Sequence, residues 1–175
     1  MFHRRLMYLL LPGMLVALCA GCASSVPKAL RSDVPETLSQ RAVQTEPARY
    51  RGREVLWGGE ILAVRNASLS TDVEIYGRPL AADAEPRASG GDGVRFIARV
   101  DRFLDPAEYQ PGKRMSVRGS LGGLVVRPVG EYSYRYPLVN ATVFHLWPKY
   151  RPPDPWPSHD PFYYRGWPCW SRWGP

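Results

Sequence analysis

The sequence predicts an all-β fold consisting of a single small β-barrel. Between Tyr50 and Trp147, short β-branched and aromatic segments alternate with turns rich in Gly, Pro, Asn and Asp. This region of about 100 residues, enough for one small domain, has no long amphipathic helical pattern. The fold should therefore be built from strands and turns, with one hydrophobic core.

The first half of this region contains three predicted strands. Residues 55–65 form a strand bent at Gly58-Gly59, and residues 66–70 form the turn that follows it. Residues 71–76 alternate, with Thr71, Val73 and Ile75 on one face and Asp72, Glu74 and Tyr76 on the other. After a loop over 79–93, residues 94–100 form a third strand with one buried face. The carboxylates of the second strand are expected on a solvated face.

The second half begins at a turn, Gln110-Pro111-Gly112-Lys113, whose Pro and Gly occupy the positions that a type II turn requires. A fourth strand over 114–121 follows, and Gly119, Gly122 and Gly123 indicate a bend or bulge. Residues 124–129 and 132–147 supply the last strands, in which Pro137 marks an edge or a bulge because it cannot donate to a ladder. Five or six such strands favour an OB-like barrel, the oligonucleotide/oligosaccharide-binding type.

The N-terminus reads as a bacterial lipoprotein signal over residues 1–21. Arg4 and Arg5 form a positive n-region, the run from Leu6 to Leu18 is apolar and too short to span a bilayer, and Gly21 precedes Cys22. Processing of such a signal leaves a covalent diacylglycerol thioether and an N-acyl chain on Cys22, and no other cofactor is expected. The alternative is an ordinary secretory signal with a coincidental cysteine.

The anchor determines the expected location and partners. No aspartate follows Cys22, so the sorting default is the outer membrane, with the domain facing the periplasm. Membrane lipid is the expected partner through the anchor, since several acyl chains hold more firmly than one. Loss of Arg4 and Arg5 lowers the formal charge from +7 to +5, and arginine suits phosphate groups. Nucleic acid is excluded by the compartment.

Two segments flank the predicted β domain of residues 49–148. Residues 22–48 are polar and contain Pro27 and Pro35, which is typical of a tether, with a short helix over 36–43 capped by Asp33. Residues 149–175 are predicted to be disordered: from Pro148 to Pro175 the chain has eight prolines and eight aromatic residues. Alternatively, the tail packs on the barrel, binds a partner as a polyproline-like ligand, or lies at the membrane interface through Trp156, Trp167, Trp170 and Trp173.

The ordered motifs of the β domain resemble the Slp family of outer-membrane lipoproteins, which is associated with starvation and stationary phase. The resemblance implies an outer-membrane location and a β-rich fold, and it carries over no catalytic residue. It rests on motifs that occur in the family's order: Tyr50-Arg51-Gly52, Trp57-Gly58-Gly59, Thr71-Asp72-Val73-Glu74-Ile75, Arg95-Phe96-Ile97-Ala98, Phe103-Leu104-Asp105-Pro106, Pro111-Gly112, Val117-Arg118-Gly119, Tyr136-Pro137 and Leu146-Trp147-Pro148.

The sequence does not favour an enzyme. The histidines after Cys22 are His145 and His159, and neither belongs to a paired metal-ligand spacing. A metal site that combined them with Asp160 and Cys169 would need the tail to fold over the barrel, so no metal site is predicted. No catalytic residue is predicted either.

Two classes of function remain open. The first is a structural or interaction role in the envelope, related to stress, in which the exposed surface contacts an envelope protein or lipid. The second is a periplasmic module that binds a small ligand or glycan on a sheet face with the aromatics Trp57, Tyr76, Tyr132 and Tyr134. These aromatics could equally belong to the core. A filled barrel would favour the first class, and a pocket lined by aromatics and arginines would favour the second.

Overall fold

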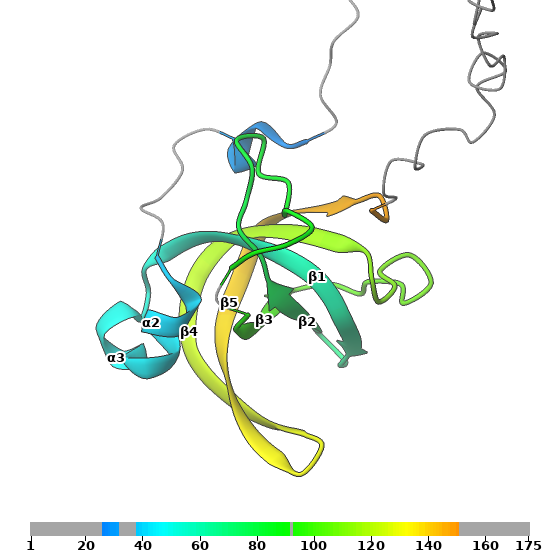
Figure 1. Ribbon diagram of the computed structural model, residues 1–175. Helices are drawn as coiled ribbons and strands as arrows, with labels where there is room; N and C mark the ends of the chain where they lie inside the picture. The colour runs from blue at the N-terminus through cyan, green and yellow to red at the C-terminus, as the bar shows by residue number, and fades with distance from the viewer. Residues whose placement is uncertain (1–25, 32–37, 92, 151–175) are drawn as a thin grey trace, which may run out of the picture.

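The computed structural model describes residues 26–31, 38–91 and 93–150 and contains a closed five-stranded barrel (Figure 1). The strands follow one another around the barrel in the order β1-β2-β3-β5-β4. Their bounds are β1 Glu54–Asn66, β2 Thr71–Gly77, β3 Arg95–Val100, β4 Arg114–Val129 and β5 Tyr132–Trp147. The predicted all-β barrel is confirmed, and its small closed sheet of five strands is OB-like.

Closure depends on the first and last strands. β1 pairs antiparallel with β4 through Glu54–Glu60 and with β2 from Gly59 onward, so this strand crosses from one partner to the other at the predicted bend. β3 and β5 close the barrel through a parallel pairing at Ile97↔Leu138, Ala98↔Val139 and Arg99↔Asn140. Only glycine fits at position 59, because an added Cβ would lie 1.9 Å from the carbonyl oxygen of Tyr76.

β4 differs from the prediction in being one strand. Residues 114–121 and 124–129 were expected as separate strands, whereas β4 runs unbroken from Arg114 to Val129. The predicted irregularity is present as register shifts at Arg118/Gly119 and Leu121/Gly123, which absorb extra residues without ending the strand. Gly112 has φ of 85°, as the second central residue of a type II turn requires.

The segment before β1 packs against the barrel. The 3-10 helix η1 (Lys28–Leu30) and helices α2 (Gln40–Thr45) and α3 (Pro47–Tyr50) occupy it, with Leu30 and Val43 buried. The predicted helix over 36–43 is wrong in its described part: Leu38 and Ser39 are not helical, and α2 begins at Gln40, where the Ser39 side chain accepts a hydrogen bond from the Ala42 backbone N–H. The predicted cap, Asp33, lies outside the described residues. The described part of the expected tether is attached to the domain.

The interior of the barrel is filled by apolar side chains from all five strands. Alternation along the strands directs these residues inward, and each buried aliphatic side chain stabilises the fold by roughly 1.5–3 kcal/mol. The central members are Val55, Trp57, Ile61, Val73, Ile75, Phe96, Ala98, Val100, Met115, Val117, Leu121 and Val139.

β4 and β5 continue past the barrel as a hairpin arm, residues 122–137, whose two strands pair with each other (Figure 1, lower part). The arm covers the outer face of β3, where Ile97, Tyr136 and Leu138 form a second buried cluster. The prediction of one buried face for the third strand is therefore wrong. Pro137 lies in the arm opposite Leu124, just before the pairing of β5 with β3 begins, which agrees with the predicted edge position.

Candidate functional site

The predicted aromatic binding face is divided by the barrel wall. Trp57 points inward and is 4% exposed, its ring centroid lies 5.3 Å from that of Phe96, and its Nε1–H donates to the Leu38 carbonyl at 2.7 Å. Tyr76 belongs to the opposite face of the sheet, where the Arg78 guanidinium lies 4.7 Å from its ring centroid. Trp57 is a core residue that also fixes the start of α2.

Tyr132, Tyr134 and Tyr136 form a row on alternate positions of β5. Their ring centroids are separated by 6.4 Å and then 4.7 Å, and burial increases from Tyr132, 71% exposed, to Tyr136, 1% exposed. The Tyr134 hydroxyl accepts a hydrogen bond of 3.0 Å from the backbone N–H of Arg95. This contact satisfies the backbone N–H of Arg95, the first residue of β3, which lies before the residues of β3 that pair with β5.

A small cavity of about 330 Å³ adjoins this row. It is lined by Gln44, Thr45, Tyr132, Tyr134 and Arg135. The Gln44 side chain donates a 2.7 Å hydrogen bond to the Arg135 carbonyl and so connects α2 to the arm. This cavity brings two of the predicted aromatics together with an arginine.

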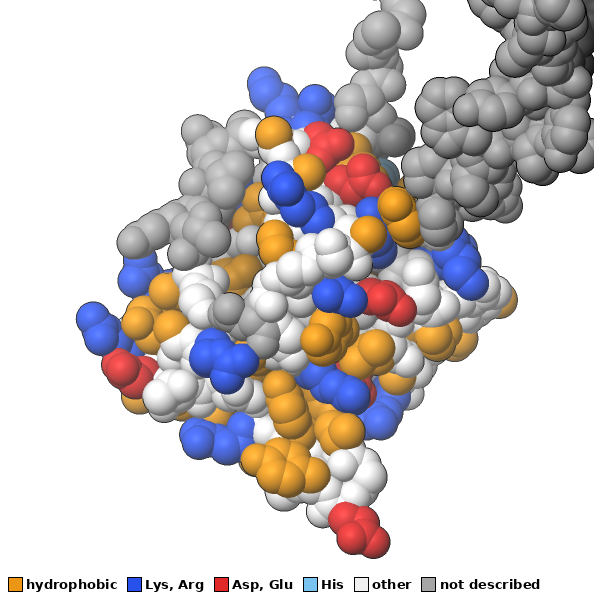
Figure 2. Space-filling view, viewed as in Figure 1, with side chains coloured by type: hydrophobic (Ala, Val, Ile, Leu, Met, Phe, Trp, Pro, Cys, Tyr) orange, Lys and Arg blue, Asp and Glu red, His pale blue; other side chains and the backbone are white. Residues whose placement is uncertain are grey.

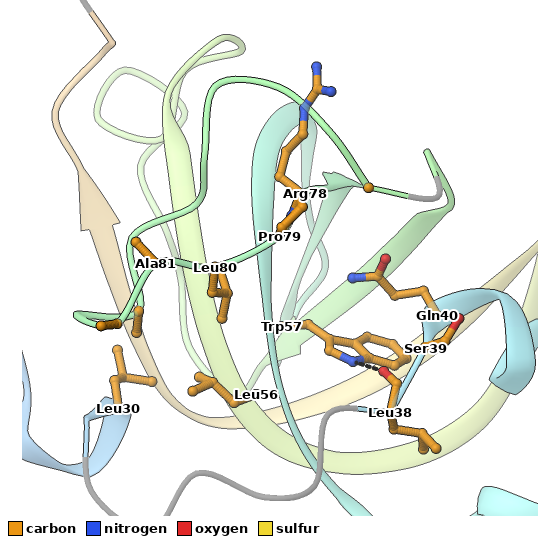
Figure 3. A pocket seen from close by; sticks show the side chains of 13 residues that line it. Leu30, Leu38, Ser39, Gln40, Leu56, Trp57, Arg78, Pro79, Leu80 and Ala81 are labelled. Carbon is orange, nitrogen blue, oxygen red and sulfur yellow. Dashed lines mark hydrogen bonds between the residues drawn. The ribbon is translucent and has the colours of Figure 1, made fainter.

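A larger apolar groove of about 530 Å³ lies between η1, the start of α2 and the loop after β2 (Figure 3). Figure 3 shows Leu56, Leu80 and Leu30 around its floor, the Trp57 ring beside Gln40 and Ser39, and Arg78 at its rim. Pockets of this size hold small molecules of moderate size. Of the predicted binding-face aromatics, Trp57 lines this groove. Leu30, Leu38 and Leu80, which line it too, come from segments far apart in the sequence.

Two carboxylates that the strand pattern predicted in solvent, Asp72 and Glu74, are buried under the arm. Asp72 and Glu74 are each 8% exposed. Asp72 accepts hydrogen bonds from Arg99 Nε and Nη2 at 2.8 and 3.0 Å, and Arg127 of the arm also binds it. Glu74 Oε1 accepts hydrogen bonds from Arg95 Nη1 at 2.9 Å and from the Tyr136 hydroxyl at 3.0 Å.

The surroundings of Asp72 and of Tyr136 change the pKa values of these two groups. Burial disfavours the ionised form of Asp72, but the hydrogen bonds from Arg99 and Arg127 outweigh it, so the pKa of this carboxyl lies below its ordinary value. Burial, followed by the nearby Glu74 carboxylate, raises the pKa of Tyr136. The register could have revealed one pair, because Asp72 lies directly opposite Arg99.

The histidine predicted to have no catalytic role lies near the end of β5. Burial lowers the pKa of His145, whose ring centroid lies 4.7 Å from that of Trp147 in an edge-on arrangement. Over residues 26–31, 38–91 and 93–150, no three His, Cys, Asp or Glu side chains come together in a way that could hold a metal ion. Cys22, Trp156, Trp167, Trp170 and Trp173 lie outside the described residues.

The profile of the Outer membrane lipoprotein Slp family matches residues 19–173, which is most of the chain. The chain belongs to this family. Among similar Slp-family sequences, the uncharacterized lipoprotein YeaY of Escherichia coli K12 is 31% identical over 91% of this chain and 83% of its own length. The outer membrane protein Slp of the same organism is 27% identical over 74% of this chain and 69% of its own length.

Membership confirms the predicted resemblance and the predicted location, a lipoprotein anchored in the outer membrane. None of the helices in the described part of this Slp-family chain has the length and apolar character needed to cross a bilayer. Among solved structures, the small single-stranded DNA-binding protein from Streptomyces coelicolor is 14% identical, with a TM-score of 0.37 over 54% of this chain and 93% of that one. The fold assignment rests on the strand order described above.

Proposed function

We propose that this lipoprotein has a non-catalytic role in the envelope, in which the hairpin arm binds a second envelope protein. The observation that carries the proposal is the exposure of apolar side chains on both faces of the arm: Val126 is 60% exposed, and Tyr132, which the register of β4 and β5 places on the other face, is 71% exposed. Figure 2 shows hydrophobic side chains gathered over this lower part of the molecule, while Lys and Arg are spread over the face in view. Exposed apolar surface of this kind is typical of protein–protein interaction sites.

The arm is well placed to reach a partner. In Figure 1 it lies at the opposite end of the barrel from η1, which follows Cys22 by only a few residues. A diacylglycerol thioether and an N-acyl chain on Cys22 would hold the η1 end near the membrane, with the domain facing the periplasm. The arm would then project away from the bilayer. The starvation association of the family suggests when this contact is needed.

The non-catalytic part of the proposal is supported by how the ionisable groups are used. Asp72 and Glu74 are both engaged in structural contacts. Arg99 and Arg95 join them to β3, whereas Arg127 and Tyr136 hold the arm against β2. The interior of the barrel is filled by the apolar core. A filled barrel whose buried carboxylates are engaged in structural contacts supports an interaction role through the outer surface.

Glycan binding is the second candidate, favoured by the small cavity beside Tyr132, Tyr134 and Arg135. Tyrosine rings offer apolar faces to a sugar ring, and the Gln44 side chain carries polar groups that can bind its hydroxyl groups. This candidate uses the same arm but a different chemistry. A protein partner depends on the apolar tip, whereas a glycan depends on the cavity.

The test places a photocrosslinking amino acid at position 126 of the lipidated full-length chain in a Gram-negative host. A matched probe replaces Leu69, which is 88% exposed in the turn between β1 and β2. We expect a discrete protein adduct at position 126 that is absent at position 69 and is lost when Tyr132→Asp is added. Equal adducts at both positions would contradict the proposal, and an adduct that only a glycan-degrading enzyme removes would favour the second candidate.

The anchor itself is tested by intact mass and membrane fractionation of the wild type and Cys22→Ser. The expected mass is that of a triacylated chain beginning at Cys22, located in the outer membrane. The variant should leave the membrane fraction. A wild-type chain that is unmodified and released with the periplasmic proteins would exclude the anchor.

A further inference from the structure

We propose that the apolar groove binds an acyl chain of a membrane phospholipid, whose phosphate group is held at the rim by Arg78. This inference goes beyond the role of the hairpin arm and concerns the opposite end of the barrel. Its placement at the bilayer rests on the proposed Cys22 anchor, but lipid binding by the groove does not.

The chemistry of the groove fits a hydrocarbon chain. Apart from Ser39, Gln40 and Arg78, the side chains that line it are apolar. They come from η1, the residues just before α2, β1 and the loop after β2, and include Leu30, Leu38, Leu56, Trp57 and Leu80. Its volume of about 530 Å³ lies within the range of pockets that bury an extended apolar ligand. Burying each methylene of such a chain contributes about 0.8 kcal/mol.

Arg78 supplies a cation at the rim of this apolar surface. Its guanidinium lies 4.7 Å from the centroid of the Tyr76 ring, and its Nη1 is 3.4 Å from the Gly90 carbonyl oxygen. No carboxylate among the described residues forms a salt bridge with Arg78, in contrast to Arg95, Arg99, Arg114, Arg118 and Arg127. A guanidinium positioned in this way can bind a phosphate through two parallel hydrogen bonds.

The groove is close to the membrane end of the chain. Leu30 lines it, and Val26 belongs to the same buried cluster as Leu30. The four residues from Cys22 to Val26 span at most about 14 Å when extended. The groove would therefore remain within a short distance of the headgroups to which Cys22 is anchored.

The phosphate site selects a phospholipid over the acyl chains of the protein's own anchor. A diacylglycerol thioether and an N-acyl chain contain no phosphate, so Arg78 would gain nothing from them. Moving an anchor chain into the groove would also weaken membrane attachment, because stable anchoring depends on more than one chain.

The test uses the chain from Ala23 to Pro175, which has no lipid of its own and retains every described residue. It is incubated with dihexanoyl phosphatidylglycerol below its micelle concentration, and binding is measured by native mass spectrometry and calorimetry. We expect a 1:1 adduct that is at least tenfold weaker in Leu80→Asp, which puts a charge in the groove. Leu69→Asp, the matched change at the far end of β2, should bind as the wild type does.

Two further measurements keep the proposal testable if Leu80→Asp does not fold. Ala82→Trp should fill the groove and block binding, with Ala67→Trp in the turn between β1 and β2 as its control. Arg78→Gln should weaken binding of phosphatidylglycerol about tenfold but leave dihexanoylglycerol, which lacks the phosphate, unchanged, and Arg65→Gln should affect neither.

The absence of an adduct would overturn the proposal, and so would an adduct that neither Leu80→Asp nor Ala82→Trp weakens. The phosphate site would be excluded if Arg78→Gln bound phosphatidylglycerol as tightly as the wild type does. Because the tested chain has no anchor and an intact arm, none of these results bears on Cys22 or on the protein partner.

Discussion

The hydroxyl group of Tyr136 on β5 donates a hydrogen bond of 3.0 Å to Oε1 of Glu74 on β2, although these two strands are not neighbours in the sheet. The bond crosses from the hairpin arm to the outer face of the barrel. Both residues are buried, so water cannot replace either partner without opening the arm.

Replacement of Tyr136 by Phe should lower the free energy of unfolding by about 2 kcal/mol, because a hydrogen bond to a charged group is lost inside the protein. Urea denaturation of the two proteins measures the difference. Tyr132→Phe removes a hydroxyl from a ring that is 71% exposed and should have no measurable effect. Equal loss in both variants would show that the bond to Glu74 is not the cause.

Asp72→Asn should destabilise the protein by about 2 kcal/mol at neutral pH, since Arg99 and Arg127 lose a charged partner. The pKa of Asp72 is lower in the folded chain than its ordinary value of 3.8, so its contribution is complete above that value and is lost as the pH falls through the lower folded pKa. Stability measured from pH 7 to pH 2 should therefore decline less steeply in the variant. Glu131→Gln, at the exposed tip of the arm, should leave the wild-type curve unchanged.

Gly59→Ala should prevent stable folding, because its Cβ would lie 1.9 Å from the Tyr76 carbonyl oxygen on the neighbouring strand. Backbone at this distance cannot move without breaking the β1–β2 ladder. Gly122→Ala is the matched control, since its Cβ would meet side chains of Asn140 and Leu138 at 3.0 Å, which can move. Thermal unfolding should show a cooperative transition for Gly122→Ala and none, or a much lower midpoint, for Gly59→Ala.

His145 should titrate below the ordinary histidine pKa of 6.5, because burial disfavours its charged form. The folded chain then binds a proton less readily than the unfolded chain, so the contribution of His145 to stability is complete above pH 6.5 and decreases as the pH falls through the folded pKa. NMR titration of the imidazole resonance, assigned with His145→Gln, measures the value. A midpoint at or above 6.5 would contradict the role assigned to burial.

The inner face of the barrel could be predicted from the sequence because it depends on local alternation. Thr71, Val73 and Ile75 face inward as their spacing required, and all three are fully buried. The outer face could not be predicted in this way. Whether Asp72 is solvated depends on the arm, whose residue Arg127 lies 55 positions later in the chain. A period-two pattern describes a strand but does not say what covers its second face.

The candidate sites also combine residues that a local sequence pattern can suggest with residues that only the folded chain brings together. The sequence proposed Tyr132 and Tyr134 as binding-face aromatics, and they line one cavity together. It also grouped Trp57 and Tyr76 with them. Alternation along each strand separates Tyr76 from Ile75, but which face of β2 adjoins Trp57 depends on the pairing Ile61↔Ile75 of β1 with β2, which a single strand's pattern does not give. The apolar groove requires Leu30, Leu38 and Leu80 to converge from three segments, which only the folded topology provides.

Val26, Leu30 and Trp147 form one buried cluster, which joins the two ends of the described chain. The chain therefore enters and leaves the domain on the same side, away from the tip of the hairpin arm (Figure 1). A reporter inserted at Gly130 and a reporter placed after Tyr150 would consequently sample opposite surroundings. Proximity labelling from these two positions in the same cell would map the neighbours of the two ends of this small domain separately.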